Sequence, residues 1–234
     1  MFVVTQIMRI LNRLLFYWHK TIAKVFKVQG KVLMLHHVGD SDKKSPYNLT
    51  VSSFENLLVK LISKNVVSLN EIHNKKDFIA LTFDDVPDDF YTNAFPLLKK
   101  YKVPFTIFIS CSLLDKPGYI SREELKAISD CPLATIGSHG ISHKLFRGMG
   151  RSQKNDEYLL SKQKLEAIIG KEVLYFAFPF GSYSSCGLLY KKDLLKYYNY
   201  GFSTIPVAFT FSSWRQKYFL PRINVEEGNI SKII

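Results

Sequence analysis

Two adjacent aspartates, Asp84 and Asp85, stand after the apolar run Phe78–Leu81. Successive residues of a strand point to opposite faces, so both carboxylates can serve one site only where the strand breaks. Val86-Pro87 supplies such a break. A glycosidase pair needs its carboxyl groups about 5 Å or more apart, usually on separate elements, which adjacent residues provide poorly. The pair suits a metal ligand beside a general base; the alternative is a helix-capping aspartate with a salt-bridged neighbour.

A second group of polar side chains contains His139 and His143, four residues apart. On a helical turn this spacing places both imidazoles on one face, where they can bind one metal. Gly137 and Gly140 favour a tight backbone there. The alternative is an ordinary surface pair of histidines. Two histidines and one carboxylate leave a tetrahedral Zn²⁺ one open position for water, whose pKa the metal would lower to ~7.

Three strands are expected to position these groups. The aspartates follow an apolar segment at 78–83, the histidines follow one at 134–137, and Pro179-Phe180-Gly181 follows one at 173–178. Strands that alternate with helices predict a mostly parallel sheet. About eight strands and six or seven helices favour a barrel, in which active sites lie at the carboxyl ends of the strands.

The remaining elements follow from apolar spacing and helix caps. Two pairs have the spacing of a capping box: Ser52 with Glu55, and Ser121 with Glu124. Asp88 or Asp89 is expected to cap a helix over 90–100. Further helices are expected at 52–63, 152–169 and 186–198, the second stopped by Gly170. Further strands are expected at 31–38, 66–69, 104–110, 201–205 and 218–225.

The composition bounds the class of protein. A chain of 234 residues with 47% hydrophobic residues can build a sizeable core, and no linker or repeat divides it. Its 32 Lys and Arg against 20 Asp and Glu give a net charge of +12, which favours an anionic neighbour. No nucleic-acid-binding motif is present, so nucleic acid is not an expected partner. Three scattered cysteines without a CxxC pattern exclude a disulfide framework and favour a reducing compartment slightly.

Residues 1–30 are expected to form an N-terminal appendage, with a helix from Met1 to about Val28. Its basic residues lie on one helical face, and apolar and aromatic residues cover most of the rest; the basic residues are Arg9, Arg13, Lys20, Lys24 and Lys27. This pattern is typical of a helix that lies in an anionic membrane interface. The alternative is a helix packed on the domain with a solvated basic edge. The basic residues argue against a membrane span, and charge follows rather than precedes the short apolar run, unlike a signal peptide.

Together these motifs resemble the polysaccharide deacetylase family, also called the NodB-homology or carbohydrate esterase 4 family. The resemblance covers roughly Lys31 to Val225, within a domain over 31–234. Segment 82–85 (TFDD) is similar to the family's first motif, 138–143 (SHGISH) to its second, and 176–181 (FAFPFG) to its third. The resemblance implies an α/β fold, a distorted (β/α)7 barrel.

The resemblance also implies residue roles. Asp84 would be the general base, and a divalent metal, expected to be Zn²⁺, would be held by Asp85, His139 and His143. The backbone N–H of Phe180 would help hold the oxyanion, and substrate would contact Pro179, Phe180 and Gly181.

The general acid of the family is usually a histidine near the C-terminus, and this chain has none after His143. Segment 32–38 (VLMLHHV) resembles the N-terminal strand of the circularly permuted branch, which includes deacetylases of poly-β-1,6-N-acetylglucosamine. His36 aligns with the acid there, and His37 is the fallback and a substrate contact. A buried structural histidine pair is the alternative.

Three positions depart from the family pattern. Val86 replaces the usual glycine after the aspartates, and Gly140 replaces a Ser or Thr whose hydroxyl normally steadies the second motif. The third motif lacks its arginine, so another cation must keep Asp84 ionised. Arg222 is the candidate, with a surface salt bridge as the alternative.

The expected function is the removal of N-acetyl groups from an amino-sugar polysaccharide or glycan intermediate. The alternatives are a non-catalytic carbohydrate-binding relative and an O-acetyl esterase acting on glycans. The absence of a clear signal peptide and the basic N-terminal segment predict a cytoplasmic protein, peripheral at the inner membrane face.

Overall fold

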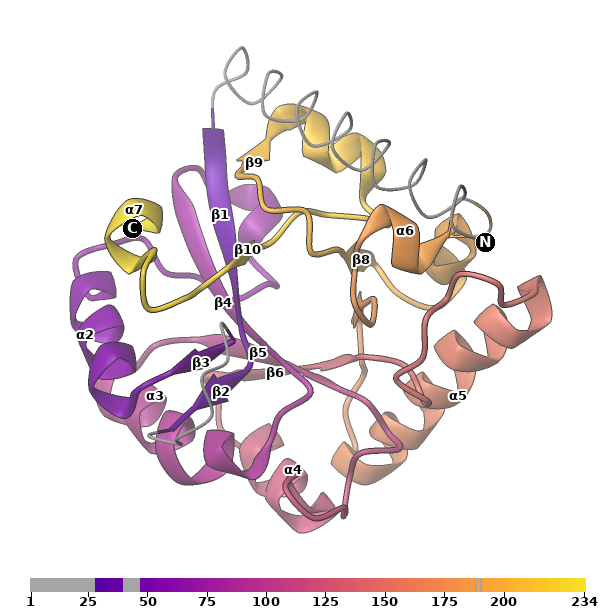
Figure 1. The fold of residues 1–234 in the computed structure, drawn as a ribbon, viewed down its shortest axis with the longest axis horizontal. Helices are drawn as coiled ribbons and strands as arrows, with labels where there is room; N and C mark the ends of the chain where they lie inside the picture. Colours follow the sequence, from indigo (N-terminus) through magenta and orange to yellow (C-terminus); the bar gives the residue numbers. More distant parts are fainter. Residues whose placement is uncertain (1–27, 40–46, 188, 190) are drawn as a thin grey trace.

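A computed structural model describes residues 28–39, 47–187, 189 and 191–234. Its main sheet curls into a barrel with the helices arranged around the outside (Figure 1). The strand order is β10-β1-β4-β5-β6-β7-β8, and every neighbouring pair along this path is parallel. A further strand, β9, pairs antiparallel with β1. The seven strands of the path confirm the predicted α/β barrel class.

The strands of the barrel are short, and their bounds are as follows: β1 Val28–Leu35, β4 Phe78–Asp84, β5 Phe105–Ile109, β6 Ala134–Ser138, β7 Tyr175–Ala177, β8 Tyr200–Phe202, β9 Phe209–Thr210 and β10 Ile223–Asn224. A separate two-stranded sheet joins β2 (His37–Val38) to β3 (Asn48–Leu49). The strand expected at 66–69 is wrong, because only Val66 forms an isolated bridge, to Ile79.

Alternation along β4 separates the two sides of the sheet. Ile79, Leu81 and Phe83 belong to the larger apolar cluster, which also contains buried side chains of the surrounding helices. Phe78 and Ala80 belong to a second cluster, with residues of β1, β5, β7 and β8. Because side chains alternate along a strand, Thr82 and Asp84 continue the series of Phe78 and Ala80 on the inner side. β4 therefore places Asp84 on the inner side of the barrel, at its carboxyl end.

The segment 218–225 closes the barrel, although the continuous strand expected there is wrong. Leu220 bridges to Phe202 of β8, and Ser203 N–H donates to the Leu220 carbonyl at 2.7 Å. After Pro221 the chain changes neighbour, and Ile223 of β10 pairs with Leu33 of β1. Proline cannot donate to a ladder, so the segment splits at this residue and contacts both edges of the curled sheet.

The helical elements are α2 Val51–Leu61, η1 Ile72–Asn74, η2 Phe90–Ala94, α3 Phe95–Tyr101, α4 Arg122–Ser129, α5 Arg151–Ile169, α6 Tyr183–Cys186, η3 Lys191–Lys196, η4 Phe211–Gln216 and α7 Ile230–Ile233. The capping box of α4 is confirmed: Ser121 Oγ accepts from Glu124 N–H, and the Glu124 carboxylate accepts from Ser121 N–H. Gly170 ends α5 at φ +70°, as predicted.

Other predicted caps and bounds are wrong. Thr50 rather than Ser52 caps α2, and Glu55 instead accepts from Lys100 and Tyr101. Asp89 precedes η2, but its side chain makes no capping hydrogen bond. Its carboxylate contacts His37 Nδ1 instead. The helix expected at 186–198 is two short elements, α6 and η3, with Gly187 at φ +71° after the first.

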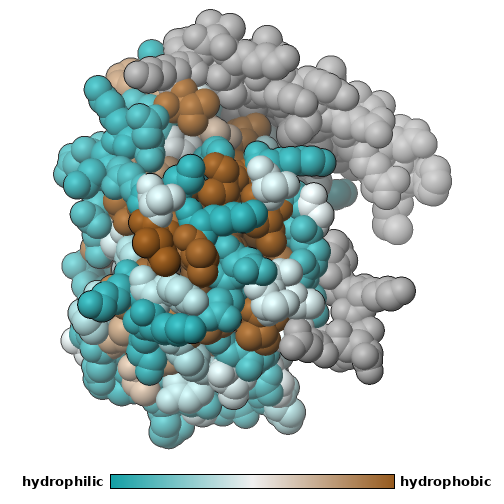
Figure 2. Space-filling view, turned by 90° about the vertical axis from the view of Figure 1, so that its left-hand side faces the viewer, coloured by the Kyte–Doolittle hydropathy of each residue, from teal (hydrophilic) through white to brown (hydrophobic). Residues whose placement is uncertain are grey.

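Figure 2 shows the face that carries α2 and α7, where apolar and polar side chains are mixed. Val59 and Ile62, in and just after α2, are exposed. Within the described residues, no helix has both the length and the apolar content needed to span a bilayer. The helix predicted for Met1–Val28 falls almost wholly outside the described residues. Val28, the one residue of that range that the structure describes, is the first residue of β1.

Candidate active site

A cleft of about 480 Å³ opens at the carboxyl ends of the barrel strands. Its walls come from the ends of β1, β4 and β6 and from the loops that follow β7, β8 and β10. The lining residues are Met34, His36, Tyr47, Asp84, Asp85, His139, His143, Phe180, Thr204, Pro206, Asn224 and Glu226. All six residues predicted for the base, acid, metal and oxyanion roles therefore line this cleft: His36, Asp84, Asp85, His139, His143 and Phe180.

Asp85, His139 and His143 form a compact cluster in the cleft, with one ligand atom of each within 4.8 Å of the others. Asp85 Oδ1 lies 3.0 Å from His143 Nε2 and 3.7 Å from His139 Nε2. The same Oδ1 is buried and has no well-aligned hydrogen bond. Burial opposes ionisation of Asp85, but the neighbouring imidazoles of His143 and His139 outweigh it and lower its pKa to about 2.

The contacts of His139 fix which ring nitrogen faces the cleft. Its Nδ1 lies 2.7 Å from the Ala177 carbonyl oxygen, which can only accept, so Nδ1 carries the hydrogen. Burial lowers the pKa of His139, which favours the neutral ring. Its Nε2 lone pair then faces the carboxylates of Asp85 at 3.7 Å and Asp84 at 4.0 Å.

The His139 Nε2 lone pair and the carboxylates of Asp84 and Asp85 face one another, and a cation between them would stabilise this arrangement. Metal-binding histidines typically donate their other ring N–H to a carbonyl or carboxylate, as His139 does. Two imidazole nitrogens and one carboxylate oxygen suit a divalent metal and leave room for further ligands. The residues present therefore fit a divalent metal.

The backbone that brings these ligands together is not the predicted helical turn. His139 follows β6 directly, Gly140 turns the chain at φ +81°, and His143 itself lies at φ +50°. On the other side of the cluster, Asp85 and Val86 adopt φ values of +62° and +49°. A β-branched residue at positive φ is uncommon, and buried Val86 occupies this conformation where the family pattern has glycine.

Asp84 makes a buried bidentate pair with Arg222. Both Arg222 Nη atoms donate to the carboxylate at 2.6 Å, and Arg222 Nε donates to the Ser203 carbonyl at 3.0 Å. Burial opposes ionisation of Asp84, but the guanidinium of Arg222 and the nearby imidazoles outweigh it and lower its pKa. The predicted partnership is therefore a buried contact rather than a surface salt bridge. A carboxylate held in this way is available as a proton acceptor at neutral pH.

His36 and His37 point in different directions, as neighbours in an extended chain do. The His36 ring lies in the cleft, 5.0 Å from the ring of Tyr47, and its Nδ1 is buried without a hydrogen-bond partner. Burial lowers the pKa of His36 against the opposing charges of Asp84 and Asp85. His37 does not line the cleft; its Nδ1 pairs with Asp89 at 2.8 Å. The expected substrate contact at His37 is not supported by this position.

The third motif contributes a single side chain to the cleft. Phe180 is 53% exposed, and its ring centroid lies 5.0 Å from that of His143. Pro179 and Gly181 are buried and do not line the cleft, so these positions do not support their predicted role as substrate contacts. Gly181 instead packs tightly: a Cβ there would lie 2.5 Å from the Thr204 side chain.

Sequence reasoning missed part of the cleft wall. Tyr47, Asn224 and Glu226 line it, and Asn224 Nδ2 donates to Glu226 Oε1 at 2.9 Å. A signal existed for two of these residues, since Asn224 and Glu226 stand at the end of the predicted strand 218–225. Tyr47 lies in a polar loop with no pattern to single it out.

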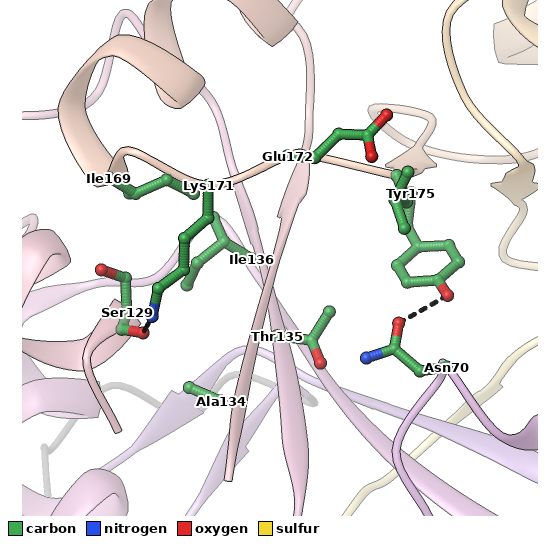
Figure 3. A pocket seen from close by; sticks show the side chains of 10 residues that line it. Asn70, Ser129, Ala134, Thr135, Ile136, Ile169, Lys171, Glu172 and Tyr175 are labelled. Atoms are coloured by element: carbon green, nitrogen blue, oxygen red, sulfur yellow. Dashed lines mark hydrogen bonds between the residues drawn. The ribbon is translucent and has the colours of Figure 1, made fainter. Parts of the chain in front are cut away.

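A second, smaller hollow of about 170 Å³ lies near the amino ends of β6 and β7 (Figure 3). There Lys171 donates to the Ser129 carbonyl, and the Tyr175 hydroxyl donates to Asn70 (Figure 3). No histidine lines this hollow. The candidate acid–base and metal-binding groups lie instead at the carboxyl edge.

The fold and the site together define an α/β barrel with a candidate metal centre at the carboxyl ends of its parallel strands. Comparison with known proteins narrows this class. Residues 71–197, more than half of the chain, match the polysaccharide deacetylase family model. The chain belongs to the polysaccharide deacetylase family.

Individual relatives agree with this assignment. A Bacillus subtilis protein named as a polysaccharide deacetylase is 29% identical over 150 residues, which are 64% of this chain and 52% of the relative. This chain thus spans about half the length of that relative. The poly-beta-1,6-N-acetyl-D-glucosamine N-deacetylase of Staphylococcus aureus is 26% identical over 226 residues, covering 86% of this chain and 75% of the relative.

The fold has solved counterparts. The structure of a Streptococcus pyogenes deacetylase in complex with acetate superimposes with a TM-score of 0.77 at 20% identity, covering 88% of this chain and 98% of that one. His36 and Arg222 both lie outside the 71–197 match to the family model. The match to the family model therefore does not cover His36 in the cleft or Arg222 buried beside Asp84.

Proposed function

We propose that the protein is a metal-dependent N-deacetylase that removes acetyl groups from an amino-sugar polysaccharide or glycan intermediate. One observation carries the proposal: the cluster of Asp85, His139 and His143 lies beside a carboxylate, Asp84, that Arg222 holds ionised. Family membership and the printed activity of the Staphylococcus aureus relative support the same reaction. The particular glycan is inferred from that relative alone.

Asp85, His139 and His143 would hold the metal, and their mixed nitrogen and oxygen donors favour Zn²⁺. When bound, the metal would polarise the acetamide carbonyl and lower the pKa of a water to ~7. Asp84 then accepts the proton of the attacking water, since its carboxylate stays ionised at neutral pH. Arg222 keeps both carboxylate oxygens of Asp84 in fixed positions.

The leaving amine must be protonated before it departs. His36 is the proposed donor, because it lies in the cleft with a buried ring nitrogen that has no protein partner. The backbone N–H of Phe180, next to His143 at the cleft, is proposed to stabilise the tetrahedral oxyanion. The products are acetate and a free amino sugar.

The test combines metal analysis of the purified protein with acetate release from N-acetylglucosamine oligomers. We expect wild type to bind about one metal per chain by the candidate site and to release acetate. Asp84→Asn should retain the metal but lose activity by on the order of 10²–10⁴, because the water has no base.

Three outcomes would contradict the proposal. A non-catalytic carbohydrate-binding relative predicts neither bound metal nor acetate release from wild type. Equal activity of wild type and Asp84→Asn would remove Asp84 as the base. Release of acetate from O-acetylated glycans alone would identify an esterase instead.

A further inference from the structure

One face of α5 contacts the chain on both sides of His139. Ser161 Oγ lies 2.7 Å from the Oγ of Ser138, the residue before His139. One helical turn earlier, Glu157 faces the residues after His139, as expected for positions i and i+4. The helix thus borders the whole loop that separates the two histidines.

Glu157 makes three hydrogen bonds to this loop. Its Oε2 accepts from the N–H of Ile141 at 2.7 Å and of Ser142 at 3.1 Å. Its Oε1 accepts from the Ser142 hydroxyl. The side chain therefore binds two consecutive residues in the middle of the His139–His143 segment.

The same loop leaves room for this carboxylate only because residue 140 is glycine. A Cβ on Gly140 would lie 2.8 Å from Glu157 Oε2, and the backbone φ of +81° also disfavours a side chain. The opposite side of the loop is held by the turn that follows β5: Cys111 N–H donates to the Gly140 carbonyl at 3.0 Å, and Ser112 N–H donates to the Ile141 carbonyl at 2.9 Å.

The Glu157 carboxylate also depends on this loop for its stabilising contacts. It is 9% exposed, and among the described residues no cation lies within ion-pair distance of it. A buried carboxylate without a counter-ion must be stabilised by hydrogen bonds, and the Glu157 side chain accepts its hydrogen bonds from the loop. Its removal would leave two backbone N–H groups without acceptors.

We propose that Glu157 is a positioning residue that fixes the spacing of His139 and His143 for metal binding. The inference rests on the proposed function insofar as these histidines bind a metal. It assigns to α5 the role of holding a loop that has no helical hydrogen bonds of its own. Glu157 does not touch the cleft, so it acts through the main chain of residues 141 and 142.

The test measures Zn²⁺ and Co²⁺ affinity of the metal-free protein by competition with a chelator. Glu157→Met, which keeps length but has no acceptor for the loop, should weaken binding about 10–100-fold, as loss of a supporting contact does. Glu157→Gln, which retains a carbonyl acceptor for the N–H groups, should stay within about threefold of wild type on the same scale.

Glu166→Met is the matched control. Glu166 lies on the same helix and accepts a backbone hydrogen bond from Val173 at 2.8 Å, far along the chain from the histidines. The Glu166→Met variant should be less stable than wild type but should bind metal with unchanged affinity. Amide hydrogen exchange in the metal-free protein gives a second readout: Ile141 and Ser142 should exchange faster in Glu157→Met and unchanged in Glu166→Met.

Unchanged metal affinity and unchanged exchange in Glu157→Met would overturn the inference, as would equal losses in Glu157→Gln and Glu157→Met. If Glu157→Met does not fold, Glu157→Asp replaces it, since the shorter carboxylate keeps the charge but cannot reach both amides; the same losses are expected. Failure of wild type to bind metal would refute the proposed function, whereas the exchange measurement would still test the contact itself.

Discussion

Adjacent aspartates serve one cleft here because the backbone reverses between them. Asp84 is the last residue of β4 and points into the barrel, where it meets Arg222. Asp85 and Val86 then take positive φ values, which bring the second carboxylate round to His143 instead of to the opposite face of the sheet. Asp84 thus has a cation as its partner and Asp85 has imidazoles, which suits the different roles proposed for them, proton acceptor and metal ligand.

Arg222→Lys should move the acid limb of the pH–activity profile to higher pH. The base acts when ionised, so activity falls as the pH drops through the pKa of Asp84, which Arg222 helps to lower. A lysine cannot reproduce the bidentate contact, so that pKa should rise. The measurement is kcat/KM for acetate release against pH, with Arg122→Lys, at an exposed ion pair, as control. An unmoved acid limb would remove Arg222 from this role.

His36 and His37 should differ in substitution experiments. His36→Gln should lower amide hydrolysis by on the order of 10²–10⁴, because the leaving amine needs a proton. Ester hydrolysis should fall less, since an alkoxide leaves more readily. His37→Gln should leave both rates within a few-fold, because its imidazole binds Asp89 outside the cleft. Equal losses on amide and ester substrates would contradict the role of His36 as acid.

Residue types and motif order are enough to identify most of the polar groups that line the cleft. The need for a cation beside Asp84 was enough to single out Arg222. Pro179, Gly181 and His37 do not line the cleft, and sequence patterns could not show this because the direction of a residue depends on its backbone φ value and strand register. Glu157 could not be found in this way either: nothing in the sequence distinguishes it from Glu166, the other glutamate of α5, and only the fold brings it to the histidine loop.

At the scale of elements, the carboxyl ends of β4 and β6 do most of the positioning. Strands with continuous apolar runs were predictable because both faces of a parallel sheet are covered. The histidine loop was not, since four-residue spacing fits a helical turn as well as the irregular loop found here. The helix expected at 186–198 failed at Gly187, whose φ of +71° ends α6 after four residues.

Gly137→Ala should destabilise β6 and disturb the site. A Cβ at Gly137 would lie 2.5 Å from the Phe108 ring and 3.2 Å from the Tyr175 carbonyl oxygen, so neighbouring strands must move. Overpacking of this kind costs about 1–3 kcal/mol of the free energy of unfolding. Because β7 also carries the Ala177 carbonyl that orients His139, metal affinity should fall too.

Chemical denaturation and metal competition measure these two effects. Gly228→Ala is the control, since a Cβ there meets no atom within 4 Å. Equal stability of Gly137→Ala and the control would contradict this prediction, because it would show that β6 and its neighbouring strands accommodate the added Cβ without a loss of stability.

At the scale of the whole molecule, the barrel depends on residues far apart in sequence. The closing segment 218–225 joins β8 to β1 and places Arg222 in the interior beside Asp84, 138 residues away. The sequence predicted the class of fold from alternating elements, but the exchange of neighbours at Pro221 is a property of the closed barrel.

Charge is also a property of the whole chain, and it is unevenly placed. Residues 1–28 contain five basic residues and no acidic residue, within a total net charge of +12. We propose that this segment attaches the protein to an anionic membrane surface, which would place its activity at the cytoplasmic face. Each basic residue near such a surface contributes ~1 kcal/mol, so the five together correspond to roughly 10³- to 10⁴-fold in affinity.

Replacement of Arg9, Arg13, Lys20, Lys24 and Lys27 by Gln should therefore weaken binding to anionic vesicles by about that factor. Co-sedimentation of the full chain with anionic and neutral vesicles measures the effect, which should also weaken from 0.15 M to about 0.5 M salt because surface charges are screened. A control with the same net charge carries Gln at five exposed lysines of the barrel: Lys60, Lys64, Lys75, Lys76 and Lys116. If the control variant lost as much affinity as the N-terminal variant, attachment would depend on overall charge and not on this segment. If wild type bound neutral vesicles as well as anionic ones, the electrostatic basis would be wrong.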